Sequence, residues 1–139
     1  RDYTNRSIPL IVGCHGMSCD YNTFFGTYVT FLNMGYAVLA PEFRGHGSNR
    51  ETTTFGIKEP LDVLAFIDYL EANNKVVDTN NMAVIGHSMG TLMGTLVYIR
   101  ESQVQGRFKA LVALSGVLNI SREIDFLAAN MNRLEISCS

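Results

Sequence analysis

Four short runs of apolar residues recur along the chain, and longer mixed stretches separate them. The runs are continuous rather than alternating, which is typical of strands buried on both faces of a parallel sheet. They are Ile8 to Val12 (IPLIV), Tyr36 to Ala40 (YAVLA), Met82 to Gly86 (MAVIG) and Ala110 to Leu114 (ALVAL). We therefore predict four strands.

The stretches between these runs predict helices. Asp20 is a suitable N-cap for a first helix that ends at Gly35. Pro60 suits the first turn of a second helix over residues 60–74. One face of that second helix is apolar in the helical period and consists of Leu61, Leu64, Ile67 and Leu70.

Two further helices are predicted, one from Met89 to Glu101 and one from Ser121 towards Met131. Strands and helices then alternate along the chain. This order predicts the α/β class, with an open, mostly parallel sheet, flanking helices and right-handed crossovers.

Composition narrows the class of protein. The 139 residues suffice for one domain, and 47% are hydrophobic against 17% charged, which excludes a disordered chain. The formal net charge of −2 gives no basic field for nucleic acid. The apolar runs are too short to cross a bilayer, so we expect neither a nucleic-acid partner nor a transmembrane segment in this chain.

Three cysteines, Cys14, Cys19 and Cys138, are too few and too unevenly placed for a disulfide framework. Cys14 and Cys19 flank His15, but zinc needs a fourth ligand at suitable spacing, and none is evident. We expect thiols rather than a metal site, a reducing and hence cytoplasmic location, and no cofactor, since no phosphate-binding glycine loop is present.

The motif G-x-S-x-G occurs as Gly86-His87-Ser88-Met89-Gly90, between a predicted strand and a predicted helix. A nucleophile at such a turn projects above the sheet, and side chains in place of the two glycines would collide where strand and helix cross. The helix N-terminus also directs free N–H groups at the serine. The alternative is an ordinary strand–helix turn in which Ser88 caps the helix.

Three segments together resemble the N-terminal half of the α/β-hydrolase family. They are LIVGCHGMSCD (10–20), GYAVLAPEFRGHGSN (35–49), with Glu42 where Asp is usual, and VIGHSMG (84–90). The resemblance implies that the loop after His15-Gly16 lies over Ser88. It also implies that the backbone N–H groups of Met17 and Met89 form an oxyanion hole.

A serine nucleophile needs a base, and the chain has three histidines. In the family, the histidine at the position of His15 supports the oxyanion loop. His46 lies in a glycine-flanked turn, which it is expected to stabilise. His87 neighbours Ser88 on a tight turn whose side chains diverge, so we expect it to support the elbow rather than to act as base.

In the family, the triad acid and histidine follow the serine in the sequence. No histidine follows Ser88, and we interpret Asp125 as a surface or capping carboxylate. The resemblance therefore implies that residues 1–139 form a partial hydrolase domain. A four-stranded sheet of this kind has two apolar edges, through which the chain by itself is expected to self-associate.

The leading hypothesis is a serine hydrolase that cleaves a small carboxylic ester through an acyl-enzyme on Ser88. GHSMG is similar to the elbow of monoacylglycerol-lipase-type enzymes, but peptidases and thioesterases share it, and a peptidase or thioesterase is the first alternative. The second is a catalytically incomplete fragment that serves as a binding or assembly module.

Overall fold

A computed structural model describes residues 7–116 and 121–122. Asp125, Cys138 and most of the predicted fourth helix lie outside the described residues. In chain order the elements are β1 (Ile8–Cys14), the short 3-10 helix η1 (Tyr21–Phe24), α1 (Phe25–Asn33), β2 (Ala37–Leu39), α2 (Glu59–Asn73), β3 (Val77–His87), α3 (Met89–Ser102) and β4 (Phe108–Leu114). The four predicted strands and first three predicted helices are confirmed.

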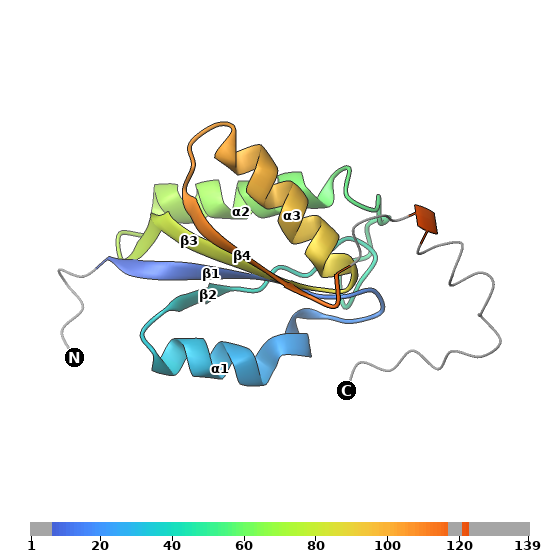
Figure 1. Cartoon of the computed structure of the whole chain (residues 1–139), viewed down its shortest axis with the longest axis horizontal. Coiled ribbons are helices and arrows are strands. Elements are labelled where there is room, and N and C mark those ends of the chain that lie inside the picture. The colour runs from blue at the N-terminus through green and yellow to red at the C-terminus, as the bar shows by residue number, and fades with distance from the viewer. Residues whose placement is uncertain (1–6, 117–120, 123–139) are drawn as a thin grey trace.

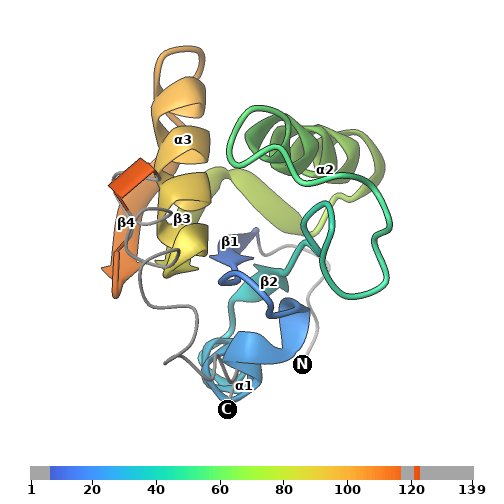
Figure 2. The same ribbon diagram turned by 90° about the vertical axis from the view of Figure 1, so that its right-hand side faces the viewer.

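The strands form one parallel sheet in the order β2-β1-β3-β4. Figure 1 shows α1 on one face of the sheet and α2 and α3 on the other, and Figure 2 shows the same layers from the side. The predicted class, α/β with an open parallel sheet, is confirmed. Because β1 and β3 are parallel, central and adjacent, the segments that follow them lie together at the carboxyl-terminal ends of the strands.

The main core lies between the sheet and the α2–α3 layer. Leu10, Val12 and Val84 from the central strands are at most 1% exposed and belong to one cluster with Val63 and Met93 from the helices. Successive residues of a strand point to opposite faces, so Ile11 and Ile85 point towards the α1 layer. Both faces of β1 and β3 are covered, as the continuous apolar runs predict.

The outer strands differ from that expectation. In β4 most side chains are exposed, including Val112 at 44% and Leu114 at 40%. The physical reason is position: β4 is an edge strand, and α1 packs against β2 rather than β4. The prediction that all four runs are buried on both faces is therefore wrong for β4. The three residues of β2 are also only partly buried.

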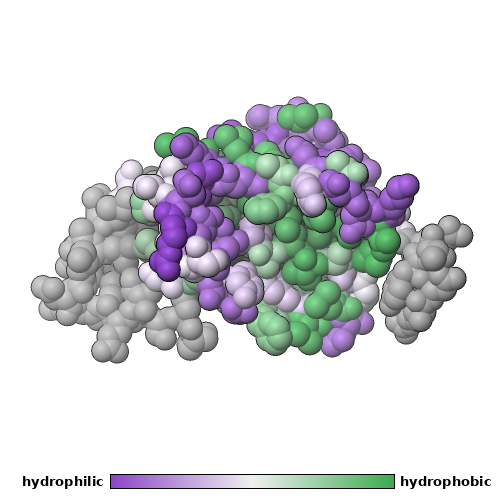
Figure 3. Space-filling model, turned by 180° about the vertical axis from the view of Figure 1, so that it is seen from behind, coloured by the Kyte–Doolittle hydropathy of each residue, from purple (hydrophilic) through white to green (hydrophobic). Residues whose placement is uncertain are grey.

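Seen from behind, apolar side chains gather over the edge strand β2 and the adjoining helix α1 (Figure 3). Leu32 and Met34, at the end of α1, are 55% and 65% exposed there. Among the described residues, β2 and β4 each have one unpaired edge. Within that part of the chain, no helix has the length and apolar character needed to span a membrane.

The buried face of α2 is shifted from the predicted one. Pro60, Val63 and Ile67 are buried, Leu64 and Leu70 pack partly against the core, and Leu61 is 50% exposed. The prediction that Leu61 belongs to the apolar face is wrong. It lies beside the helix start, where the chain enters from residues 53–58 and Pro60 takes the inward position.

A buried carboxylate, Glu59, fixes the start of α2. Its two oxygens accept hydrogen bonds from the backbone N–H groups of Thr54 (2.6 Å) and Gly56 (2.9 Å) and from the hydroxyls of Thr53 (3.2 Å) and Thr54 (2.7 Å). Burial opposes ionisation, but the hydrogen bonds, those of Thr54 foremost, outweigh it and lower the pKa of Glu59 to about 2. The carboxylate therefore ties the preceding loop to the helix.

We predict that Glu59→Gln lowers the free energy of unfolding by about 2–3 kcal/mol at pH 7, because an amide cannot accept all four hydrogen bonds. Since the folded-state pKa lies below the usual 4.5, the wild-type advantage is present above pH 4.5 and is lost as the pH falls towards 2. Urea denaturation at several pH values measures this. Glu51→Gln is the control, because the side chain of Glu51 is 71% exposed.

Candidate active site

Ser88 occupies the turn between β3 and α3 in a strained conformation. Its φ of 53° and ψ of −123° lie in a region that residues other than glycine seldom adopt. The strain is held from both sides: the Ser88 N–H donates to the carbonyl of Leu114 (3.0 Å), and the Ser88 carbonyl accepts from the Thr91 N–H (2.9 Å). The serine side chain makes no capping hydrogen bond to the helix. The capping alternative therefore has no support in this geometry.

The two glycines of the motif permit this turn. A Cβ on Gly90 would lie 2.0 Å from the carbonyl oxygen of Cys14, and a Cβ on Gly86 would lie 2.4 Å from the carbonyl oxygen of Gly90. Both obstacles are backbone atoms, which cannot move aside. The first turn of α3 thus crosses the ends of β1 and β3 in direct backbone contact.

The loop after β1 lies against the elbow. β1 pairs with β3 so that Cys14 is the partner of Gly86. A Cβ on Gly16 would come within 3.4 Å of both the His87 carbonyl and the Cβ of Ser88. Gly16 therefore borders the serine.

Two backbone N–H groups at this point are unengaged. Neither Met17 nor Met89 donates its backbone N–H to another described residue. Met89 is the first residue of α3, where helical N–H groups have no partner within the helix. The Met89 side chain is buried in the core, and that of Met17 packs partly against the same cluster. The methionine side chains thus serve packing, whereas their backbone N–H groups have no partner among the described residues.

His15 holds the loop in place through both ring nitrogens. Nε2 accepts a hydrogen bond from the Phe43 N–H (3.0 Å), so Nδ1 carries the proton and donates to the Gly16 carbonyl (2.8 Å). This arrangement requires a neutral ring. Burial lowers the pKa of His15, and the neighbouring His46 adds to the effect, although the bond to Gly16 opposes both.

The turn at residues 42–48 supports His15 from the other side. The ring of His46 lies 5.1 Å from that of His15, and its Nδ1 bonds the carbonyl of Arg44 (2.9 Å). Glu42, where the family usually has Asp, accepts from the N–H (2.8 Å) and hydroxyl (2.6 Å) of Ser48, and these bonds lower its pKa. Glu42 therefore closes this turn as a structural carboxylate.

The His87 side chain lies against η1 and the loop after β1. Its ring packs edge-on against Phe24, with centroids 6.1 Å apart. Its Nδ1 is buried without a hydrogen-bond partner among the described residues and lies near Gly16. Within that same part of the chain no histidine, His15 and His46 included, is hydrogen-bonded to Ser88. The structure does not bring a general base to the serine from residues 7–116.

Sequence reasoning missed Phe43 and Thr91. Phe43 supplies the N–H that fixes the His15 tautomer, and Thr91 is buried in the first turn of α3 with its hydroxyl bonded to the Gly86 carbonyl (2.9 Å). The only available signal for Thr91 was its place one residue after the motif. Hydroxyl bonding back to a preceding carbonyl is common for Thr in helices.

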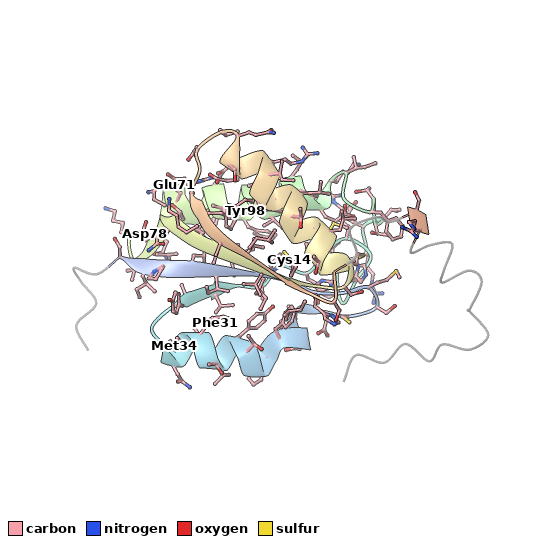
Figure 4. The ribbon with its side chains drawn as sticks, viewed as in Figure 1. Cys14, Phe31, Met34, Glu71, Asp78 and Tyr98 are labelled. Atoms are coloured by element: carbon pink, nitrogen blue, oxygen red, sulfur yellow. The ribbon has the colours of Figure 1, made fainter. Side chains whose placement is uncertain are left out.

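Cys14 is a free buried thiol at the end of β1, beneath α3 (Figure 4). Burial raises its pKa to about 12, so it stays protonated and is no nucleophile. Cys19 takes part in a disulfide bond, and the expectation of free thiols is wrong for that residue. Among the described residues, no group of three His, Cys, Asp or Glu side chains is arranged to hold a metal ion.

A cavity of about 540 Å³ lies between the turn at 41–51 and α2, lined in part by Phe43, Arg44, Asp62, Val63, Phe66 and Tyr69. Arg44 and Asp62 form a two-point ion pair at its wall, with N–O distances of 2.5 and 2.8 Å. Ser88 does not line this cavity. It is therefore separate from the serine.

Comparison with known proteins identifies a matching family and a relative. A family model described as serine aminopeptidase, S33 matches residues 6–136. An uncharacterized protein of Rickettsia prowazekii (strain Madrid E) is 25% identical over 125 residues, a match that covers 88% of this chain and 50% of that protein. The chain thus spans about half the length of the curated relative it matches.

Solved structures share the fold. The Pyrococcus furiosus esterase Pf2001 is 29% identical with a TM-score of 0.69, over 92% of this chain and 51% of that chain. A hydrolase from Pseudomonas aeruginosa PA01 is 21% identical with a TM-score of 0.65, over 92% of this chain and 46% of its own. At that identity the second likeness concerns the fold alone.

We predict that Gly90→Ala lowers the free energy of unfolding by at least about 3 kcal/mol, because its methyl group would overlap the Cys14 backbone. Gly26→Ala is the matched control. Gly26 lies in α1 with no atom within 4 Å of a Cβ, so this change is neutral or stabilising by up to about 1 kcal/mol. Equal effects of the two changes in urea denaturation would contradict the close contact.

We predict that His15→Phe lowers the free energy of unfolding by about 1–3 kcal/mol at pH 7.5. The substitution leaves the Phe43 N–H and the Gly16 carbonyl unpaired. The folded-state pKa of His15 lies below the usual 6.5. Its contribution is therefore present above pH 6.5 and is lost as the pH falls through the folded-state pKa. The stability difference between wild type and variant should shrink from pH 7.5 to 5; a constant difference would disprove the neutral tautomer.

Proposed function

The chain belongs to the serine aminopeptidase S33 family of α/β-hydrolases, and from this premise we propose that Ser88 is the nucleophile of a serine hydrolase that cleaves carboxylic esters. The observation that carries the proposal is the conformation of Ser88. Ser88 is held at positive φ and its side chain makes no capping hydrogen bond to the helix that it precedes. Backbone strain of this kind is common at active sites, and the unused hydroxyl is available for reaction.

The proposed reaction proceeds through an acyl-enzyme. The Ser88 oxygen attacks the ester carbonyl, its proton passes to a base, and the tetrahedral oxyanion accepts hydrogen bonds from the backbone N–H groups of Met17 and Met89. Collapse expels the alcohol, which takes up the proton, and water then hydrolyses the acyl group. Removing one donor of such a hole typically costs about 10²–10³ in rate.

The two N–H groups suit this role because they are unengaged and come from segments that pack against each other. Met17 follows Gly16, where an added Cβ would contact His87 and Ser88, and Met89 follows Ser88 directly. His15 fixes the first segment and the α3 N-terminus fixes the second. Donors that are fixed before the reaction need no reorganisation during it.

The proposal requires a base that none of the three histidines supplies in this geometry. His15 uses both ring nitrogens for structure, His46 bonds Arg44, and His87 packs on Phe24. We assign the base and its acid partner to the part of the protein outside residues 1–139. The likeness to longer relatives supports this assignment, since this chain covers about half of each.

A peptidase is the second candidate, and the description of the matched family favours it. The likeness to an esterase at 29% identity favours ester cleavage. An aminoacyl p-nitroanilide and a p-nitrophenyl ester of short acyl chain separate the two. Turnover of the ester with no release of p-nitroaniline supports the esterase, and the reverse supports the peptidase.

We predict that a fluorophosphonate probe labels the full-length wild-type protein, which includes the part outside residues 1–139, and that Ser88→Ala abolishes labelling while the thermal midpoint is unchanged. Ser115→Ala is the matched control. Ser115 is also a serine at positive φ (52°), but it is exposed and follows β4. The probe should label the Ser115→Ala variant at the wild-type rate.

Labelling that survives Ser88→Ala would show that another residue is the nucleophile. No labelling of the wild-type protein would favour a non-catalytic binding or assembly module. The unpaired edges of β2 and β4 support self-association in that case, which light scattering measures.

A further inference from the structure

The hydroxyl of Thr91 joins three backbone segments beneath the strained serine. Thr91 is fully buried in the first turn of α3. Its Oγ1 donates to the Gly86 carbonyl at 2.9 Å and lies 3.3 Å from the Leu114 carbonyl. One hydroxyl proton is thus shared between the end of β3 and the end of β4.

The Leu114 carbonyl is also the acceptor for the Ser88 N–H, at 3.0 Å. The Thr91 N–H in turn donates to the Ser88 carbonyl, at 2.9 Å. Thr91 therefore contacts Ser88 directly through its backbone and indirectly through its side chain. Together these bonds surround Ser88, whose backbone lies at positive φ.

We propose that Thr91 is a positioning residue for the nucleophile. Its hydroxyl keeps the Gly86 and Leu114 carbonyls at the spacing that holds Ser88 at positive φ, and so it sets the direction of the Ser88 oxygen and of the adjacent Met89 N–H. The proposal rests on the proposed function, because it assigns Thr91 to the reaction of Ser88.

The hydroxyl rather than the methyl group carries this role. A Cβ on Gly116 would approach the Thr91 methyl to 3.2 Å, so the methyl group packs against the chain after β4, and valine preserves that packing. Valine keeps this methyl group and replaces the hydroxyl by a second one, which cannot donate a hydrogen bond. Serine removes the methyl group and keeps the bond, so the two substitutions separate packing from positioning.

Thr95 is the matched control. It lies one helical turn after Thr91, is partly buried, and its Oγ1 donates to the Thr91 carbonyl at 2.7 Å. The two threonines thus lie in the same helix, and each donates its hydroxyl to a backbone carbonyl. Only Thr91 bonds the strand ends beneath Ser88.

The test compares Thr91→Val, Thr91→Ser and Thr95→Val with the wild type. The rate of fluorophosphonate labelling and the kcat and KM for p-nitrophenyl butyrate are measured. We expect Thr91→Val to lower the labelling rate and kcat about tenfold with KM within about twofold. Thr91→Ser should restore both rates to within about threefold, and Thr95→Val should leave them unchanged.

Amide hydrogen exchange over residues 84–94 supplies a readout that needs no activity. Thr91→Val should accelerate exchange of the Ser88 amide, which is bonded to Leu114, and Thr95→Val should not. If labelling and exchange in Thr91→Val match the wild type, or if Thr95→Val slows labelling equally, the proposal is wrong. If the wild type is not labelled at all, the proposed function fails, and the exchange comparison alone then decides whether Thr91 holds the elbow.

Discussion

The contact on which this structure depends is the crossing of α3 over the ends of β1 and β3. Backbone meets backbone there: a Cβ on Gly90 would strike the Cys14 carbonyl, and one on Gly86 would strike the Gly90 carbonyl. No larger residue could bring the helix so close. The close approach forces the chain to reverse between His87 and Met89, and this reversal projects Ser88 out of the sheet in its strained conformation.

A second layer of interactions holds the loop that faces the serine. His15 connects the Gly16 carbonyl to the Phe43 N–H, so the loop after β1 is positioned by the turn after β2. That turn is closed by Glu42 and Ser48, and Arg44 anchors it to Asp62 of α2. Hydrogen bonds thus continue from the serine's surroundings to a helix on the far side of the core. The neutral state of His15 is part of this construction, because a protonated ring could not accept from Phe43.

The sheet is covered unevenly. Its central strands are buried on both faces, whereas β4 exposes Val112 and Leu114. The match to half of a relative and to half of an esterase structure agrees with a sheet that has apolar edge strands. The proposed nucleophile and the two candidate oxyanion donors nevertheless lie within one compact unit. This part of the candidate active site is therefore well defined, even though no base reaches Ser88 from residues 7–116.

The sequence by itself determined the elements and the position of the turn that holds Ser88. Continuous apolar runs, Pro60, Asp20 and the two motif glycines act locally, over the few residues that form a strand, a cap or a turn. Tertiary structure decided what depends on neighbours distant in the sequence. The exposure of β4 and of Leu61, the four bonds to Glu59, the His15 tautomer and the bonds of Thr91 each require partners that only the folded chain brings together. Burial and hydrogen bonding are properties of an environment, and a linear pattern does not specify which atoms supply it.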